Sequence, residues 1–249
     1  MLIRFWVEGY RCFGKRLELD LTDKKNYRFG VECVRGDFLD KMVVIGSNNA
    51  GKTSLGFAMT DIVCTAGGFS KDIGQKNVEC FLNKDTEADV ATFHYELSHR
   101  GSIVTYEYSK SSPDDMVAES LMLDRHLVYR YDLRDGKGLE YDPDRLRIRS
   151  IPNIGKDRSL IMRITESSFV DPDSAVGVVI SFATHSLYYM AMWKMDVHIG
   201  LIDEEDNTER YLVRNGLVPE FQSFLRDQCM VDIDLLSCEG NLLVKKSHG

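Results

Sequence analysis

Two residues suited to phosphate chemistry, Lys52 and Thr53, stand at the end of a loop bounded by glycines. Residues 46–53 read GSNNAGKT, a full match to the pattern GxxxxGK[ST]. Glycines at both ends allow the chain to fold back tightly, so that successive backbone N–H groups point into one concavity. The Lys52 ammonium would pair with β- and γ-phosphates, and the Thr53 hydroxyl suits Mg²⁺. The loop therefore predicts a site for a nucleoside triphosphate.

A strand and a helix must hold this loop for its chemistry to work. Residues 42–45 form a short apolar run that we expect to be the strand leading into the loop. From Lys52 to about residue 65 the sequence predicts a helix that ends before Gly67-Gly68 and adds its positive dipole end to the anion site. Its apolar face comprises Leu55, Ala58, Met59, Ile62 and Val63. The alternative, a glycine-containing surface turn, does not require this setting between strand and helix.

Length and charge limit the classes of function. At 249 residues the chain can form one sizeable domain or two small ones. A net charge of -8 argues against a protein that coats nucleic acid without sequence preference, although a local basic face stays open. The basic, irregular stretch 142–156 could be such a face, but we favour a solvated strand with its charges outward.

Cysteine spacing and hydropathy point to a cytoplasmic protein without a membrane span. The six cysteines include no C-x-x-C pair, which argues against an obvious zinc site and fits reduced thiols. The longest apolar stretch, residues 176–189, is interrupted by serine, threonine and histidine. The N-terminus mixes charged and apolar residues within a few positions, unlike a signal peptide.

Alternating apolar residues predict a sheet built from hairpins, and later segments predict helices. The expected hairpins join residues 2–10 to 16–21, 90–97 to 103–108 and 118–123 to 127–131, with a further strand at 139–141. A helix over 175–195, capped by Pro172-Asp173-Ser174, and another over 218–228 precede short strands at 231–236 and 241–245. The aromatic and Met-rich stripe of the first of these helices (Phe182, Tyr189, Met192 and Trp193) indicates packing.

The N-terminal hairpin and the loop together resemble one family. Residues 5–13, FWVEGYRCF, resemble the opening F-x-V-x-N-[FY]-R-S-F of ABC-type chromosome and defence ATPases, which include SMC and RecF proteins, OLD-like nucleases and abortive-infection AAA-type ATPases of bacteria. The loop carries their G-x-N-x-x-G-K-[ST] variant, and Phe81-Leu82-Asn83 followed by 91–108 looks like their segment after the first helix. The resemblance covers roughly the first half of the chain and becomes weak beyond Tyr131.

This resemblance implies an α/β fold of the ABC-type P-loop NTPase, with a mixed sheet, an antiparallel β-layer and a C-terminal helical segment. It makes residues 1–249 a single and incomplete ATPase head, with the hairpin and loop in 1–66, the β-rich layer in 67–158 and the helical segment in 159–249. Arg11 would lie near the nucleotide, and Lys52 would be the catalytic lysine. Contacts to ATP would come from Arg11, Gly46, Ser47, Asn48, Asn49, Ala50, Gly51, Lys52, Thr53 and Ser54, with Thr53 on Mg²⁺. Gly9 and Cys12 depart from the usual Asn and Ser.

Two motifs of the family are a signature loop and an acidic pair. No stretch of this sequence resembles the signature loop. Residues 197–204 end in Asp203-Glu204 and imitate the acidic pair, in which Asp203 would hold Mg²⁺ through water and Glu204 would polarise the attacking water. Because the preceding helix lacks a signature-like turn, we expect instead an exposed acidic turn well away from Lys52.

The resemblance implies an ATP-dependent dimer switch that controls an effector, such as a nuclease or a toxin, in anti-phage defence or DNA maintenance. The missing motifs suggest that the chain is the N-terminal part of a longer ATPase. The alternative is a nucleotide-binding regulatory module that does not hydrolyse ATP by itself.

Overall fold

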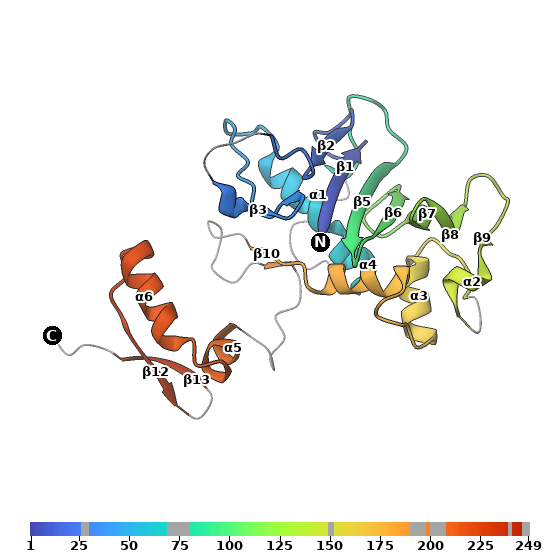
Figure 1. Ribbon diagram of the computed structural model, residues 1–249. Coiled ribbons are helices and arrows are strands. Elements are labelled where there is room, and N and C mark those ends of the chain that lie inside the picture. Colours follow the sequence, from blue (N-terminus) through green and yellow to red (C-terminus); the bar gives the residue numbers. More distant parts are fainter. Residues whose placement is uncertain are drawn as a thin grey trace. The chain divides into compact units, whose positions relative to one another are not determined.

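The computed structural model (Figure 1) describes residues 1–25, 30–68, 80–148, 152–189, 198–199, 208–238 and 241–245. The chain divides into two compact units, Met1–Gly200 and Leu201–Gly249. The first unit contains a large sheet with helices. The second contains two helices and a β-hairpin.

A seven-stranded antiparallel sheet forms the framework of the first unit. The strand order is β2-β1-β5-β6-β7-β8-β9. The strands are β1 (Leu2–Glu8), β2 (Leu17–Asp20), β5 (Ala91–His99), β6 (Ser102–Lys110), β7 (Met116–Leu123), β8 (His126–Asp132) and β9 (Glu140–Tyr141). The three hairpins expected from the alternating pattern are confirmed. The expected mixed sheet is not found in the described part of the chain, where every strand pair is antiparallel.

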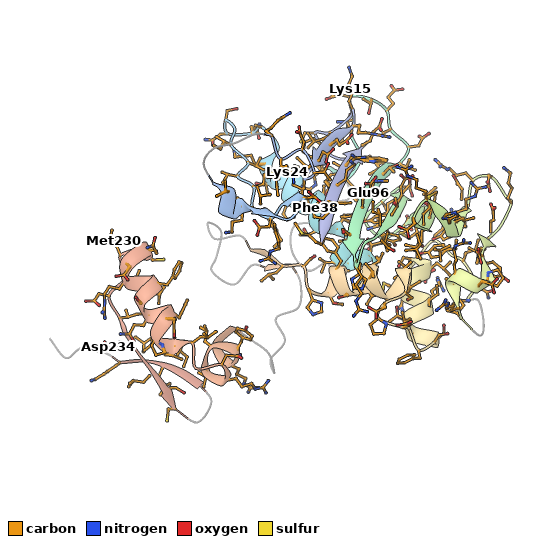
Figure 2. The ribbon with its side chains drawn as sticks, viewed as in Figure 1. Lys15, Lys24, Phe38, Glu96, Met230 and Asp234 are labelled. Carbon is orange, nitrogen blue, oxygen red and sulfur yellow. The ribbon has the colours of Figure 1, made fainter. Side chains whose placement is uncertain are left out.

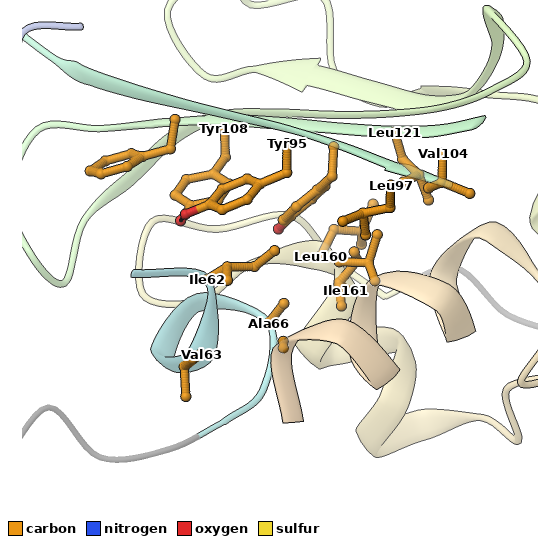
Figure 3. Close-up of a cluster of buried hydrophobic side chains, with 14 of the residues drawn as sticks. Ile62, Val63, Ala66, Tyr95, Leu97, Val104, Tyr108, Leu121, Leu160 and Ile161 are labelled. Atoms are coloured by element: carbon orange, nitrogen blue, oxygen red, sulfur yellow. Dashed lines mark hydrogen bonds between the residues drawn. The ribbon is translucent and has the colours of Figure 1, made fainter. Parts of the chain in front are cut away.

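Three helices provide the apolar contacts on one face of this sheet: α1 (Lys52–Thr65), α3 (Leu160–Ser167) and α4 (Ala175–Thr184). In Figure 3, Tyr95 and Tyr108 extend from the sheet toward Ile62 of α1, and all three side chains are fully buried. Leu160 begins α3 in the same core. Since side chains alternate along a strand, every second residue of β5 and β6 enters this core.

The opposite face of the sheet is polar. On this face His94 of β5 lies between two cross-strand neighbours, Trp6 on β1 and Glu107 on β6. The Trp6 and His94 rings stack with centroids 4.8 Å apart, and His94 Nδ1 lies 2.8 Å from Glu107 Oε2. Glu96, labelled in Figure 2, continues this polar face on β5, four-fifths buried among its neighbours. Helix α1, which follows the loop of residues 46–53, therefore lies on the apolar side of the sheet.

Helix α1 confirms the helix expected after the loop, from Lys52 to Thr65. Its expected apolar positions Leu55, Ala58, Ile62 and Val63 are buried. Gly68, at φ 78°, follows the helix in the left-handed conformation that glycine adopts readily.

The prediction of a strand at residues 42–45 is wrong. A 3-10 turn, Val31–Cys33, and a small hairpin of β3 (Val34–Arg35) and β4 (Phe38–Leu39) precede this segment, but residues 41–47 form no strand. Val43 and Ile45 are 83% and 88% exposed. Both edges of β1 are taken, by β2 and by β5, so β1 offers this apolar run no free edge on which to pair.

Residues 142–148 form a short helix in place of the solvated strand expected over 142–156. Helix α2 spans Pro143–Leu146. Asp142 caps it by accepting hydrogen bonds from the amides of Asp144 and Arg145, and Leu146 is buried. The capping carboxylate and the proline at the first helical position outweigh the alternating pattern.

The helix expected over 175–195 ends at Thr184. Ser174 caps its N-terminus as expected. Near its end the Thr184 and Ser186 hydroxyls donate to the carbonyls of Ile180 and Phe182, so polar side chains compete for the helix's own acceptors. Tyr188–Tyr189 then forms β10, paired with β11 (His198–Ile199), which places Tyr189 on a strand. Met192 and Trp193 lie outside the described residues.

The second unit consists of α5 (Thr208–Arg214), α6 (Val218–Cys229) and the hairpin of β12 (Asp234–Cys238) and β13 (Asn241–Lys245). Helix α6 and β13 confirm the elements expected there, and β12 begins three residues later than expected. Among the helices of the described ranges, none is both long and apolar enough to cross a membrane.

Candidate functional site

The side chain of Lys52 bonds to the backbone of its own loop. Lys52 Nζ donates hydrogen bonds to the carbonyl oxygens of Gly46, at 2.8 Å, and Ser47, at 2.7 Å. A weaker backbone bond of 3.3 Å joins the amide of Ala50 to the same Ser47 carbonyl. All residues from 41 to 50 are exposed. The ammonium group is thus bonded to carbonyls of its own loop, in an exposed segment of the unit.

Two left-handed residues shape the loop. Asn49 has φ 68° and Gly51 has φ 91°. Gly51 is the N-cap of α1 and provides no side-chain cap, so the first amides of the helix lack the partner that a capping side chain would offer. Successive amides that turn into one concavity at a helix N-terminus favour an oxyanion.

The turn of the N-terminal hairpin forms a wall beside the loop. A Cβ built on Gly51 would lie 2.7 Å from Cys12 Sγ and 3.4 Å from the Phe13 ring, so there is no room for a side chain. The turn is closed by backbone bonds in both directions between Tyr10 and Phe13, at 3.2 and 2.7 Å. The glycine that precedes Lys52 is therefore required both by its backbone conformation and by this contact.

Arg11, which the family resemblance places near the nucleotide, lies against α1. Its guanidinium carbon is 4.9 Å from the centre of the Phe57 ring and 5.4 Å from that of Tyr10. The Arg11 amide donates to the Phe81 carbonyl at 3.0 Å, and Asn83 Nδ2 donates to the Arg11 carbonyl at 2.6 Å. The segment Phe81-Leu82-Asn83 thereby holds the Arg11 turn in place beside helix α1.

One neighbour of the site was missed by the sequence reasoning. The ring of Tyr188 on β10 lies where a side chain on Gly56 would be, 2.5 Å from a built Cβ, and contacts Phe57 with ring centres 5.6 Å apart. Gly56 follows Lys52 by one helical turn. The apolar pattern of residues 175–195 predicted a continuous helix and gave no signal for this contact.

Three further expected site residues lie on either side of the helix start. Asn48, in the loop, and Thr53, the second residue of α1, are exposed, and Ser54 is half-buried. Within the described ranges no group of three or more His, Cys, Asp or Glu side chains is arranged to hold a metal ion. A Mg²⁺ that arrives with a nucleotide takes most of its ligands from phosphates and water, so it does not require such a group. Asp203 and Glu204 lie outside the described residues.

No protein-family model matches the chain, and no curated protein matches it either. The likeness to ABC-type ATPases therefore rests on the residues of the hairpin and the loop. Their meeting in space, at Gly51 and Cys12, is independent of that likeness.

Proposed function

We propose that the chain binds ATP with Mg²⁺ through residues 46–53. The observation that carries this proposal is Lys52, whose ammonium is held by the Gly46 and Ser47 carbonyls at the start of α1. A lysine on two carbonyls of its own loop can exchange them for phosphate oxygens without a change in the backbone. Each phosphate bond to the ammonium is charge-assisted and therefore stronger than the carbonyl bond that it replaces.

The remaining contacts follow from the loop's shape. The amides between Asn49 and Thr53 donate to phosphate oxygens, and the dipole of the 14-residue helix α1 favours the negative charge. The Thr53 hydroxyl binds the Mg²⁺ that bridges the phosphates. The Arg11 turn forms one wall, so a nucleotide enters from the exposed side of residues 41–50.

This exposed side favours a site that is completed by another surface. In the ABC-type arrangement two protomers enclose two ATP molecules, and the dimer controls an effector such as a nuclease or a toxin. We propose this switch, in anti-phage defence or DNA maintenance, as the role of the chain. The alternative is a regulatory module that binds ATP and does not hydrolyse it. Steady-state hydrolysis by the isolated chain, measured beside the Glu204→Gln variant, separates the two.

The binding test is Lys52→Ala. Removing charge-assisted bonds of about 1.5–3 kcal/mol should weaken ATP binding by one to two decades in calorimetry. Lys137→Ala, which removes the same charge from a side chain 84% exposed on the β8–β9 loop, is the matched control and should bind as the wild type does. Equal affinities of the wild type and Lys52→Ala for ATP would contradict the proposal.

Self-association is the test of the switch. Light scattering should detect a dimer that ATP and Mg²⁺ favour and that Lys52→Ala does not form. A strict monomer in both conditions, for a chain that binds ATP, would favour the regulatory module.

A further inference from the structure

Apolar burial by itself does not fix the rotation of helix α1. Nine of its 14 residues are buried, and they include the consecutive run from Thr60 to Thr65, so they surround the helix. Burial of apolar area is non-directional, and a helix that is buried nearly all round has no narrow apolar face that selects one orientation. Some other interaction must set the orientation of the phosphate loop that α1 carries.

A buried ion pair joins α1 to the sheet. Lys110 Nζ on β6 lies 2.6 Å from Asp61 Oδ2 on α1, and the two side chains are only 2% and 3% exposed. The same carboxylate oxygen accepts from the Tyr108 hydroxyl at 2.8 Å and from the Thr65 hydroxyl at 2.9 Å. Three donors, two from strand β6 and one from the helix itself, thus converge on a single oxygen in the core.

Two further bonds hold the same half of α1. The hydroxyl of Tyr95 on β5, whose ring extends toward α1 in Figure 3, donates to the Ala58 carbonyl at 2.9 Å. The hydroxyl of Ser159, the N-cap of α3, donates to the Thr65 carbonyl. The second half of α1 is therefore fixed by directional bonds to β5, β6 and α3, whereas its first turn carries the exposed loop.

We infer that Asp61 and Lys110 are positioning residues, which fix the rotation and depth of α1 and thereby hold the phosphate loop in its binding geometry. The consequence for ATP rests on the proposed function. A buried ion pair adds little net stability over apolar residues of similar volume, and in some proteins such buried polar groups serve to specify one arrangement. Asp61 follows Lys52 by nine residues, about 13 Å along the helix axis. A small rotation at the ion pair therefore moves the loop against the wall formed by Cys12.

The experiment replaces the pair by apolar residues and measures the loop directly. In the double variant Asp61→Leu/Lys110→Met the protein should stay folded, and the urea midpoint should fall only by the cost of the Tyr108 and Thr65 hydroxyls, which lose their acceptor. Loop exchange, measured as hydrogen exchange of the first amides that are bonded within α1 (residues 55–59), should become at least tenfold faster, and ATP affinity should fall at least tenfold. Ile62→Val is the matched control, because it removes one methylene from the next helix position and keeps the ion pair. It should leave the exchange of the loop unchanged.

A second variant covers the case in which the double variant does not fold. Tyr108→Phe removes one donor to Asp61 at constant ring size, and it should accelerate loop exchange by several-fold. Unchanged loop exchange in Tyr108→Phe, or in a folded double variant, would overturn the inference. Faster loop exchange in a protein whose wild type does not bind ATP would instead overturn the proposed function and leave the positioning role intact.

Discussion

Gly51 of the phosphate loop and Cys12 of the N-terminal hairpin are in contact: a Cβ on Gly51 would lie 2.7 Å from Cys12 Sγ. The strand β1, the turn and the loop are separate segments of the sequence, and this contact joins them into one site. A serine at position 12, as in the ATPases that the hairpin resembles, would have a smaller atom at the same place. The larger sulfur makes the contact at Gly51 closer in this chain.

Gly51→Ala should lower the free energy of unfolding more than Gly101→Ala does. Both glycines have a left-handed backbone conformation, with φ 91° at Gly51 and 88° at Gly101. Nothing lies within 4 Å of a Cβ built on Gly101. Alanine in this conformation costs about 1–2 kcal/mol at either position. The clash with Cys12 and Phe13 should add about 1–3 kcal/mol at Gly51 alone. Urea denaturation of the two variants measures the difference.

The Cys12→Ala/Gly51→Ala double variant tests the cause of that difference. Removing the sulfur should recover part of the additional loss, because the two changes share one contact. Equal losses in Gly51→Ala and Gly101→Ala would show that the hairpin turn does not constrain the loop.

Thr53→Ala should weaken ATP binding only when Mg²⁺ is present. The hydroxyl is exposed, and the variant loses one metal ligand while the loop amides and Lys52 remain. We expect about a tenfold loss of affinity with Mg²⁺, roughly 1.4 kcal/mol, and little change in a chelator. Calorimetry in both conditions is the measurement. Equal losses with and without the metal would make Thr53 only the second residue of the helix.

The antiparallel sheet could be predicted because its signals are local. The β5–β6 and β7–β8 hairpins each combine two alternating runs with a short polar turn, and the turn positions Arg100 and Gly101 are left-handed, as such turns require. Helix α1 has an equally local signature, with Gly51 before it and Gly67-Gly68 after it. These elements depend on neighbours in the sequence, and their boundaries agree with the structure to within a few residues.

The wrong predictions concern segments whose secondary structure depends on distant parts of the chain. Residues 42–45 have the composition of a buried strand, but β1 already pairs with β2 and β5, and Val43 and Ile45 stay exposed. The end of α4 depends on the back-bonding of Thr184 and Ser186, which an apolar pattern does not detect. The contact of Tyr188 with Gly56 likewise requires the tertiary fold.

Polar changes at Val43 and Ile45 should leave stability almost unchanged. These side chains are 83% and 88% exposed, so Val43→Ser and Ile45→Ser remove little buried area. Each change should alter the free energy of unfolding by less than about 0.5 kcal/mol. Val104→Ser, at a position 1% exposed, is the control and should cost roughly 2 kcal/mol or more. A loss at Ile45 as large as that at Val104 would mean that this segment is covered in solution.

The buried carboxylate of Glu119 joins the sheet to helix α3. It accepts from the hydroxyls of Tyr106, Tyr129 and Tyr131, at 3.0, 2.6 and 3.0 Å. The amide of Leu160 donates to it at 2.6 Å. Complete burial disfavours the charged form and raises the pKa of Glu119 above its ordinary 4.5, while these donors oppose the shift.

This raised pKa predicts a pH dependence that is opposite to that of a surface ion pair. As pH rises above about 4.5, Glu119 ionises in the unfolded chain before it ionises in the folded protein, so the folded protein loses stability until the raised pKa is passed. The stability of the wild type relative to Glu119→Gln should therefore fall with rising pH, by at most about 1.4 kcal/mol per pH unit. Tyr131→Phe, which removes one donor to the carboxylate, should extend the fall to higher pH. Urea denaturation from pH 4 upward measures it, and a relative stability that rises over this range would show that the donors outweigh burial.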